Sequence, residues 1–574
     1  MTRLLVALLV FAAITTGCAN IPDRTPPKVV LDVPVSEPRK VGKPSPDLDP
    51  FTLVHEFIEA AGNPEAAKTY LTEEARQKWP SSTVPTILED GFTNPPLTGQ
   101  ESRPGVDPAN PDEKVVVLTG TVVGRLRQDH VFSPEPGSLE YRMVVRRQPD
   151  RQWRIATPHP DLLITRAKFA VAYRPVNLQF FDPEQRAMVS DPRYVENEPR
   201  EDLEGNVVRL LLAGPSDTLK QAVRNQLDGI KLRTNVVQEG GAIVVNLAPV
   251  DKSVDDRKLM AAQIVESLRE VTASPVRILS LDRPLLAQQV EWRSSDVDSY
   301  DALTTPKADL LGLVASGGRI YSMRDGKPIE GPAGSGAYDI VNAAQSIDGS
   351  QLAVVQRTDT GMRLRVGPLN GDLAEVSLPA AANLTRPTWL YGDNGGREVW
   401  TVLDGTVVIR AVRTPQGGWE DLGVEASQLT ADGGTITQLR LSRDGVRVAA
   451  VVNGEVKIAS VVRADDAVTI TLPRTLHGGK ITDAVGVDWM GKDTLIVATR
   501  QNTRPVLRVP IDGLDFDGYS YSTLTQPITA VTAAPSRRPV VTDGSGMWSL
   551  QETGKIWEAH THGKGPGSVP FYPG

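Results

Sequence analysis

A motif that recurs through the C-terminal half of the chain restricts the possible folds more than any other feature. The segment Ser346–Gly349 (Ser-Ile-Asp-Gly) reappears as Ser442–Gly445 (Ser-Arg-Asp-Gly), each followed by a strand-like apolar run. Trp389 and Trp489 alternate with these segments, at successive spacings of 43, 53 and 47 residues. A period of about 40–50 residues is typical of β-propeller blades. The sequence therefore predicts a β-propeller with five or six blades over residues 297–574.

The Ser-x-Asp-Gly segments could suggest a hydrolase, but the geometry of a tight turn explains them. An Asp side chain accepts hydrogen bonds from nearby backbone N–H groups, and Gly adopts the positive φ that closes the turn. The chain has no Gly-x-Ser-x-Gly elbow, no His-Glu-x-x-His helix and no phosphate-binding loop. His560 and His562 have a spacing that could grip a metal, but no third ligand stands near them in the sequence. We therefore predict no catalytic residue, no metal and no cofactor; a propeller hydrolase or lyase, with a site assembled from distant blades, is the alternative.

The N-terminus has the pattern of an export signal. Arg3 precedes an uninterrupted apolar run over residues 4–14, and small residues then lead to Cys18. The run is too short for a transmembrane helix, which needs about 20 apolar residues. Residues 15–18 resemble a lipobox, although Thr15 stands where that motif most often has Leu.

The lipobox resemblance implies a lipoprotein signal peptide over residues 1–17. Thr15, Thr16 and Gly17 would be recognised by the signal peptidase, and Cys18 would carry S-diacylglycerol and N-palmitoyl groups. The mature chain would then be anchored in the cell membrane on its extracytoplasmic face, since two acyl signals give stable anchoring. The alternative is an ordinary secretory signal in which Cys18 is incidental.

The composition fits an exported chain held together by its core alone. Cys18 is the only cysteine, so lipid would consume the one thiol and leave no disulfide. Residues 18–50 contain eight prolines and are predicted to form an extended tether. At about 3.1 Å per residue, such a tether reaches up to roughly 100 Å. The net charge is −8 and there is no basic run, which argues against nucleic-acid binding.

Residues 51–165 are predicted to form an α+β domain. Asp49-Pro50 and Asn63-Pro64 both read as helix starts, with a capping residue before a proline. Strand-like runs follow over residues 115–124, 139–147 and 152–156. Helices followed by a curved sheet resemble the cone-shaped fold of nuclear transport factors, which in exported proteins implies an interaction module. His55 on the first helix is interpreted as a surface or rim residue.

Residues 166–290 carry a more specific pattern. We predict a strand over residues 207–212, a Gly214-Pro215 turn and a helix that starts at Ser216 and runs through Leu227. A hairpin around Glu239–Gly241, an amphipathic helix over residues 259–268 and a strand over residues 276–281 complete the region. This ordered set resembles a GerMN domain, an α/β module of bacterial envelope lipoproteins. The resemblance implies binding or assembly rather than catalysis.

The whole chain is therefore predicted to be multidomain and mainly β, with an N-terminal α+β domain, an α/β GerMN domain and a C-terminal five- or six-bladed β-propeller. A lipobox, a tether and these domains in this order resemble the actinobacterial LpqB lipoprotein family. The resemblance implies a non-catalytic accessory that binds the extracellular domain of a sensor histidine kinase (MtrB-like). It would modulate two-component signalling in cell-wall homeostasis and division. An envelope-assembly scaffold or peptidoglycan-binding protein without a kinase partner is the alternative.

Overall fold

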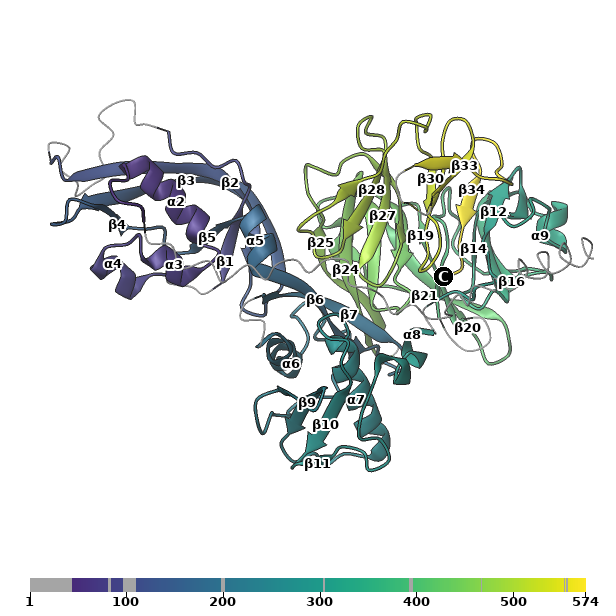
Figure 1. Cartoon of the computed structure of the whole chain (residues 1–574). Coiled ribbons are helices and arrows are strands. Elements are labelled where there is room, and N and C mark those ends of the chain that lie inside the picture. The colour runs from purple at the N-terminus through teal and green to yellow at the C-terminus, as the bar shows by residue number, and fades with distance from the viewer. Residues whose placement is uncertain are drawn as a thin grey trace, which may run out of the picture.

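The computed structural model describes residues 44–80, 84–95, 110–197, 202–302, 305–391, 396–465, 467–551, 553 and 556–574. The predicted lipobox residues Thr15, Thr16, Gly17 and Cys18 lie outside these ranges, as do residues 18–43 of the predicted tether. The described part is mainly β and builds an N-terminal α+β domain, a GerMN domain and a propeller (Figure 1). The predicted fold class is therefore confirmed.

Three short helices pack on a five-stranded sheet in the N-terminal domain. Asp49 caps the first helix by accepting hydrogen bonds from the backbone N–H groups of Phe51 and Thr52. Asn63 caps the second in the same way. The helices are α2 (Pro50–Ala60), α3 (Pro64–Lys68) and α4 (Glu73–Lys78). The sheet has the order β4-β3-β2-β1-β5, with β1 (Pro85–Leu88), β2 (Glu113–Leu126), β3 (Phe132–Arg147), β4 (Trp153–Thr157) and β5 (Leu162–Thr165).

A two-stranded hairpin that the sequence did not predict links the three domains. Helix α5 (Arg166–Ala172) leads into β6 (Tyr173–Phe181), which pairs antiparallel with β7 (Met188–Glu196). Most residues of β7 are buried on both faces, and the buried residues include Asp191 and Arg193. A strand buried on both faces lacks the alternation of apolar and polar residues by which half-exposed strands are recognised. Figure 1 shows the hairpin running between the N-terminal domain, the GerMN domain and the propeller.

The GerMN domain packs helices on a sheet with the order β11-β10-β9-β8. The hairpin turn over residues 239–241, the amphipathic helix and the closing strand are present as predicted. The helix α7 connects β9 to β10, and these two strands are parallel. The elements are α6 (Leu203–Ala213), β8 (Val237–Glu239), β9 (Ala242–Leu247), α7 (Val254–Leu268), β10 (Val276–Ser280) and β11 (Arg283–Pro284).

The structure corrects two predictions at the start of this domain. The predicted strand over residues 207–212 lies inside helix α6, which buries Leu203, Val207 and Leu211 at helical spacing. A short apolar run is compatible with either structure, and the helical period becomes visible only when Leu203 is included. The predicted helix from Ser216 is a series of turns instead. The backbone N–H of Ser216 donates to the Asp191 carboxylate on β7, which holds the segment against the hairpin.

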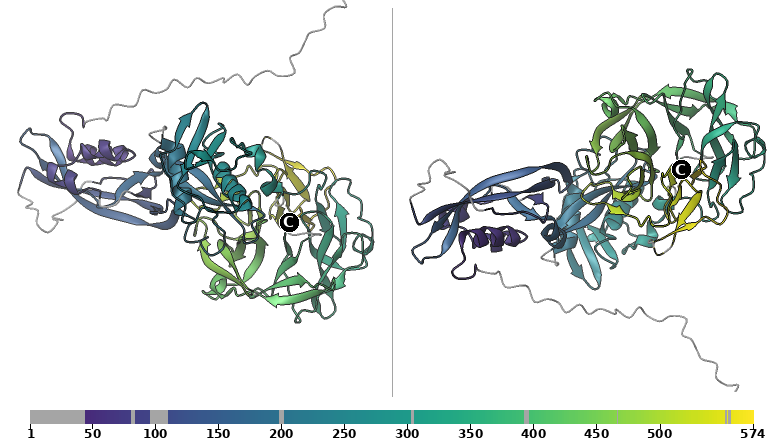
Figure 2. Two further views of the ribbon diagram at one scale, coloured as in Figure 1. Left: turned by 90° about the horizontal axis from the view of Figure 1, so that it is seen from below. Right: turned by 90° about the horizontal axis from the view of Figure 1, so that it is seen from above.

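The propeller has six blades, the larger of the two predicted numbers. Blade 1 is closed by strands from both ends of the domain, because β34 (Val569–Phe571) pairs with β12 (Leu313–Ser316), which pairs with β13 (Arg319–Ser322). Figure 2 shows the blades arranged as a ring around the C-terminal residues.

Blades 2 to 6 are four-stranded sheets of consecutive antiparallel strands. Their strands are β14 (Ile340–Gln345), β15 (Gln351–Thr358), β16 (Gly361–Pro368) and β17 (Ala374–Glu375); β18 (Thr388–Leu390), β19 (Glu398–Leu403), β20 (Val407–Arg413) and β21 (Trp419–Gly423); β22 (Ile436–Leu441), β23 (Arg447–Val452), β24 (Glu455–Ala464) and β25 (Ala467–Thr475); β26 (Ala484–Trp489), β27 (Thr494–Thr499), β28 (Val506–Pro510) and β29 (Asp517–Gly518); and β30 (Ala530–Thr532), β31 (Val540–Thr542), β32 (Met547–Leu550) and β33 (Trp557–Ala559). The short helices η2 (Ser294–Asp296), α8 (Ser299–Ala302), α9 (Pro332–Ser335) and η3 (Ser427–Thr430) lie in the connections.

The repeated motif forms blade turns, as the sequence predicts. Asp348 accepts hydrogen bonds from the Ser346 hydroxyl at 2.7 Å and from the Ser350 backbone at 3.1 Å. Gly349 follows with a φ of 81°. The alternating tryptophans join neighbouring blades, since Trp389 Nε1 donates to the Ala344 carbonyl at 3.0 Å in the preceding blade. The Ser-x-Asp-Gly segments and the alternating tryptophans therefore both have structural roles.

Candidate binding sites and the charged propeller channel

The histidines that the sequence singled out do not gather with other potential metal ligands. His55 is exposed and stacks on Phe92, with 4.7 Å between ring centroids, as expected for a rim residue. His560 and His562 are neighbours in a loop, where His560 Nδ1 accepts the backbone N–H of His562 at 3.3 Å. In the part of the chain that the structure describes, no group of three His, Cys, Asp or Glu residues could hold a metal ion. None of the helices described is long and apolar enough to cross a bilayer.

The innermost strands of the six blades place charged residues along the axis of the ring. Because side chains alternate along a strand, every second residue of each inner strand points into the channel. One layer contains Arg440 from β22, Asp488 from β26 and Thr532 from β30. Arg386 lies one layer above, just before β18, and Arg443 lies below, after β22. The cluster thus has three guanidiniums around one carboxylate, and all four side chains are buried.

Asp488 is the centre of this cluster. Its carboxylate lies 3.2 Å from Arg440 Nε and 3.5 Å from Arg386 Nη1. It also accepts the hydroxyl of Thr532 at 2.8 Å and the backbone N–H of Ala533 at 3.2 Å. Asp488 therefore holds inner strands from four blades together across the channel.

The pKa values in the cluster reflect burial and an excess of positive charge. Burial and the repulsion of Arg440 lower the pKa of Arg386 to about 9. Burial also lowers the pKa of Arg443, to about 10. Burial alone would raise the pKa of Asp488, but the charges of Arg440, Arg386 and Arg443 outweigh it and lower this pKa to about 2. At neutral pH Arg386, Arg443 and Asp488 are therefore charged.

The three arginines differ in how well they are hydrogen-bonded. Arg440 donates to the carbonyls of Pro387 at 2.6 Å and Gly574 at 2.8 Å. Arg443 donates to the carbonyls of Trp489 at 2.9 Å and Ala533 at 3.1 Å. Arg386 has only contacts of 3.4–3.5 Å, and its Nε has no hydrogen-bond partner among the described residues.

A second buried charge pair lies where the hairpin meets the other domains. Arg193 and Asp191 on β7 form an ion pair of 2.6 Å, and both side chains are almost wholly buried. Arg193 also donates to the carbonyl of Asp129 in the N-terminal domain at 2.6 Å and to that of Gly214 in the GerMN domain at 3.2 Å. Asp191 accepts the backbone N–H of Ser216 at 2.8 Å. One ion pair therefore joins two domains through the hairpin.

The propeller contacts the same hairpin through buried polar groups. Arg447 donates to the carbonyl of Ser190 on β7 at 2.5 Å. Tyr391, at the end of β18, donates to the carboxylate of Asp182 at 2.6 Å. Burial and this carboxylate both raise the pKa of Tyr391. The GerMN core extends into the propeller as well, since it includes Val446.

A loop of blade 5 contacts the N-terminal domain directly. Leu514 packs into a cluster with Phe169 and Tyr194 and is 5% exposed. Asp512 accepts the Tyr194 hydroxyl at 2.6 Å, and Arg166 donates to the Leu514 carbonyl at 2.9 Å. Arg474 on β25 donates to the Phe132 carbonyl of the N-terminal domain at 3.2 Å, and Lys480, before β26, donates to Glu89 at 2.8 Å. Buried contacts therefore join all three domains.

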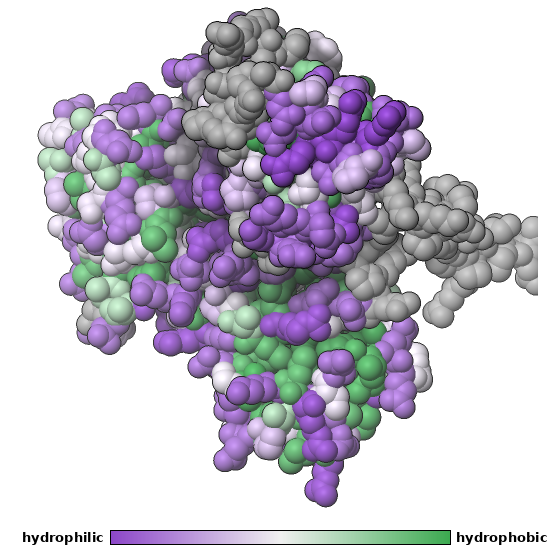
Figure 3. Space-filling model, turned by 90° about the vertical axis from the view of Figure 1, so that its left-hand side faces the viewer, coloured by the Kyte–Doolittle hydropathy of each residue, from purple (hydrophilic) through white to green (hydrophobic). Residues whose placement is uncertain are grey.

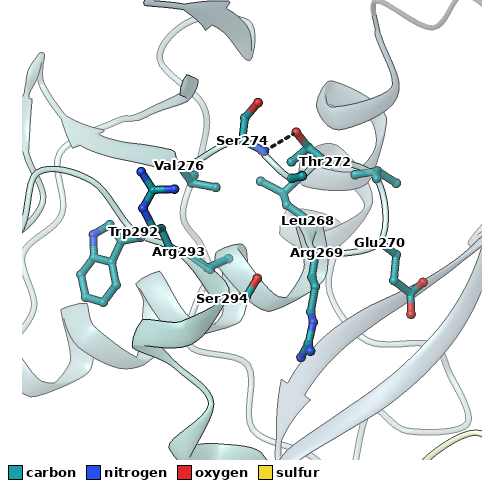
Figure 4. Close-up of a pocket in the computed structure, with 12 residues that line it drawn as sticks. Leu268, Arg269, Glu270, Thr272, Ser274, Val276, Trp292, Arg293 and Ser294 are labelled. Atoms are coloured by element: carbon teal, nitrogen blue, oxygen red, sulfur yellow. Dashed lines mark hydrogen bonds between the residues drawn. The ribbon is translucent and has the colours of Figure 1, made fainter. Parts of the chain in front are cut away.

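A large cavity lies in the GerMN domain, beside the end of α7. It has a volume of about 540 Å³ and opens to solvent. Figure 4 shows Trp292 and Arg293 on one side of it and Leu268 and Thr272 on the other. The Glu270 carboxylate, at its margin, accepts hydrogen bonds from Asn177 and is part of the hairpin contact. Three charged residues, Arg269, Glu270 and Arg293, are among those that line the cavity in Figure 4, and Arg269 also pairs with Glu266 at 3.0 Å.

Apolar residues gather on one face of the GerMN domain. Figure 3 shows a continuous hydrophobic area over the lower part of the molecule, which is this domain. Its half-buried apolar residues around α6 and the segment before β8 include Leu210, Leu232 and Val236. Val237 on the edge strand β8 is 49% exposed. This GerMN apolar face is suited to contact with another protein.

The channel and the hairpin joint were both missed by sequence reasoning. A signal for the channel exists, because Asp488 directly precedes Trp489 in an aligned repeat, where an inner strand is otherwise apolar or neutral. Arg440 stands at the matching position, two residues before Ser442. Aligning the blades position by position would have placed both charges on inner strands. No comparable signal marks Arg193, because the hairpin itself was not recognised.

Three protein-family models match consecutive parts of the chain. The lipoprotein LpqB N-terminal domain matches residues 43–170. A model described as sporulation and spore germination matches residues 175–285, and the lipoprotein LpqB β-propeller domain matches residues 318–573. Among solved structures, a nidogen/laminin complex is similar to 45% of this chain over 97% of its own. The sequence identity is 11% and the TM-score is 0.33.

Curated relatives match over the full length. Lipoprotein LpqB of Nocardia farcinica is 31% identical over 100% of this chain and 98% of its own. Lipoprotein LpqB of Mycolicibacterium smegmatis is 30% identical over 100% of both chains. Lipoprotein LpqB of Mycobacterium tuberculosis is 30% identical over 99% of both. At 30–31% identity over 99–100% of its length, the chain belongs to the LpqB lipoprotein family.

Proposed function

We propose that this protein is a non-catalytic accessory, lipid-anchored at Cys18 on the extracytoplasmic face of the cell membrane. It binds the extracellular domain of a sensor histidine kinase (MtrB-like) and modulates two-component signalling in cell-wall homeostasis and division. The kinase is the partner that the family resemblance implies. The observation that carries the proposal is the joint at the β6–β7 hairpin. There the Arg193–Asp191 pair contacts the N-terminal and GerMN domains, and Arg447 of the propeller donates to Ser190.

The charged groups of the propeller channel support a structural role rather than catalysis. Arg440 and Arg443 donate to backbone carbonyls, and Asp488 accepts from backbone and side-chain donors of the inner strands. A general acid or base has to reach a proton on a bound substrate, whereas Asp488 is held by these partners inside the ring.

The GerMN apolar face is the proposed contact surface for the kinase. Val237 exposes half of an apolar side chain on the edge strand β8, beside the half-buried Val236. Edge strands and exposed apolar patches are common features of protein interfaces.

Capture of the full-length lipoprotein by the purified extracellular domain of the kinase tests this proposal. The detergent-solubilised wild-type protein is expected to be retained above an unrelated lipoprotein. Val237→Asp is expected to weaken retention by about tenfold or more, because it buries a charge in an apolar contact. Val407→Asp is the matched control, since Val407 is 53% exposed on β20 of the propeller. Retention no better than the unrelated lipoprotein would count against the proposal, and co-sedimentation with peptidoglycan alone would favour the scaffold alternative.

Lipid attachment at Cys18 gives a separate prediction. Cys18→Ser is expected to abolish labelling by radioactive palmitate and to leave the signal peptide uncleaved, because a hydroxyl cannot form the thioether. The folded domains should be unaffected, since Cys18 lies ahead of the first predicted domain, which begins at residue 51. Ser36→Ala, within the predicted tether, is the matched control and should be labelled normally. Palmitate uptake by the Cys18→Ser protein would refute the assignment of the anchor.

A further inference from the structure

The end of the propeller channel that faces away from the other domains contains a small pocket. Its volume is about 160 Å³, and it is lined by residues at the start of all six inner strands. One layer of the lining consists of Asn342, Arg386, Gln438, Gly486, Ala530 and Val569. Ligand pockets for drug-sized molecules are about 300–1,000 Å³, so this pocket suits a single small group.

Arg386 is the cation of this pocket. It is 4% exposed, its Nε lacks a hydrogen-bond partner in the described part of the chain, and its other contacts are 3.4–3.5 Å long. A buried guanidinium is normally paired and fully hydrogen-bonded, because an unpaired buried charge is costly. Arg386 therefore lines the pocket while its Nη atoms make only long contacts with their other neighbours.

The charges around Arg386 also favour the binding of an anion. Arg386, Arg440 and Arg443 face the single carboxylate of Asp488, which is itself already bound to Arg440 and Thr532. These four side chains carry three positive charges and one negative. Burial, together with the repulsion of Arg440, lowers the pKa of Arg386 to about 9. A bound anion would relieve the repulsion.

The neutral part of the lining supplies suitable donors. Asn342 and Gln438 enter the same layer from β14 and β22, and both are half-buried. Side-chain amides donate two N–H groups each, and a guanidinium presents a planar fork that matches oxyanions. Gly486 and Ala530 leave the opposite side of the layer without bulk.

We propose that this pocket binds a small oxyanion group, a phosphate or a carboxylate, between Arg386 and the amides of Asn342 and Gln438. The group enters from the channel mouth opposite the domain joint. The contacts of Arg447, Tyr391 and Asp512 with the other domains lie at the opposite end of their blades and leave this mouth uncovered.

Nuclear magnetic resonance of the full-length protein with two probes at constant ionic strength tests this proposal. Phosphorus-31 line broadening follows inorganic phosphate, and carbon-13 line broadening follows labelled acetate, so the two arms separate the possible sources of the group. Saturable broadening by the wild-type protein is expected for at least one probe. Arg386→Gln is expected to weaken it by about tenfold or more, because a hydrogen bond to a charged group is lost.

Control variants separate loss of the anion site from a general loss of charge or of folding. Arg508→Gln alters an exposed arginine on β28 of the same propeller and should bind as the wild type does. If Arg386→Gln does not fold, Asn342→Ala and Gln438→Ala should each weaken binding while Arg508→Gln does not. Absence of saturable broadening by both probes, or equal broadening by the wild type and the Arg386 or amide variants, would overturn the proposal.

Discussion

Asp488→Ala is expected to lower the free energy of unfolding of the propeller by about 3–5 kcal/mol, the usual cost of breaking a buried ion pair by removing one partner. The substitution leaves Arg386, Arg440 and Arg443 buried without their carboxylate. It also removes the acceptor for Thr532. Denaturant unfolding followed by the fluorescence of the buried propeller tryptophans measures the loss.

An exposed carboxylate on the same blade provides the control. Asp517 lies 3.5 Å from Arg508 and is 76% exposed, so Asp517→Ala should cost at most about 1 kcal/mol. Adding Arg386→Met to Asp488→Ala should recover part of the lost stability, because it removes one uncompensated charge. Equal effects of Asp488→Ala and Asp517→Ala would show that the channel cluster does not hold the ring together.

The pH dependence of this effect has a defined sign. The pKa of Asp488 is lowered from 3.8 to about 2 in the folded chain. Its contribution to stability is therefore present in full above its ordinary pKa and is lost as the pH falls through its folded pKa. The difference in stability between the wild type and Asp488→Ala should shrink between about pH 5 and about pH 2.

Local patterns explain which parts of the fold the sequence predicts. The blade turn depends on Asp348 and Gly349, whose roles are set by neighbouring backbone groups, so the motif is readable from sequence alone. The helix cap at Asp49 is equally local. The apolar run over residues 207–212 is ambiguous because its helical period extends outside the run.

Long-range contacts form the parts of the structure that the sequence does not predict. Asp488 meets Arg386 across 102 residues of chain, and Tyr194 meets Asp512 across 318. Nothing in the residues around Asp488 indicates that two other blades supply its cations. The candidate sites of this protein therefore form only when the propeller ring closes and the domains dock. Its domain types, in contrast, can be predicted from local sequence patterns.

Arg193→Met is expected to cost about 3–5 kcal/mol of stability for the same physical reason, and to loosen the domain joint as well. The variant leaves Asp191 buried without its cation and removes the donors to Asp129 and Gly214, one in each neighbouring domain. Limited proteolysis should then cut between the domains faster than in the wild type, and calorimetry should show a wider or split unfolding transition.

Two variants separate loss of charge pairing from loss of packing at this joint. Arg233→Met breaks an ion pair of 3.0 Å with Asp282 in which both side chains are well exposed, so it should cost at most about 1 kcal/mol and leave proteolysis unchanged. Asp191→Asn keeps an oxygen that can accept the Ser216 N–H but carries no charge. Added to Arg193→Met, it should restore part of the stability, because no unpaired carboxylate remains buried. If the double variant is as unstable as Arg193→Met alone, the joint depends on the shape and hydrogen bonds of Arg193 and not on its charge.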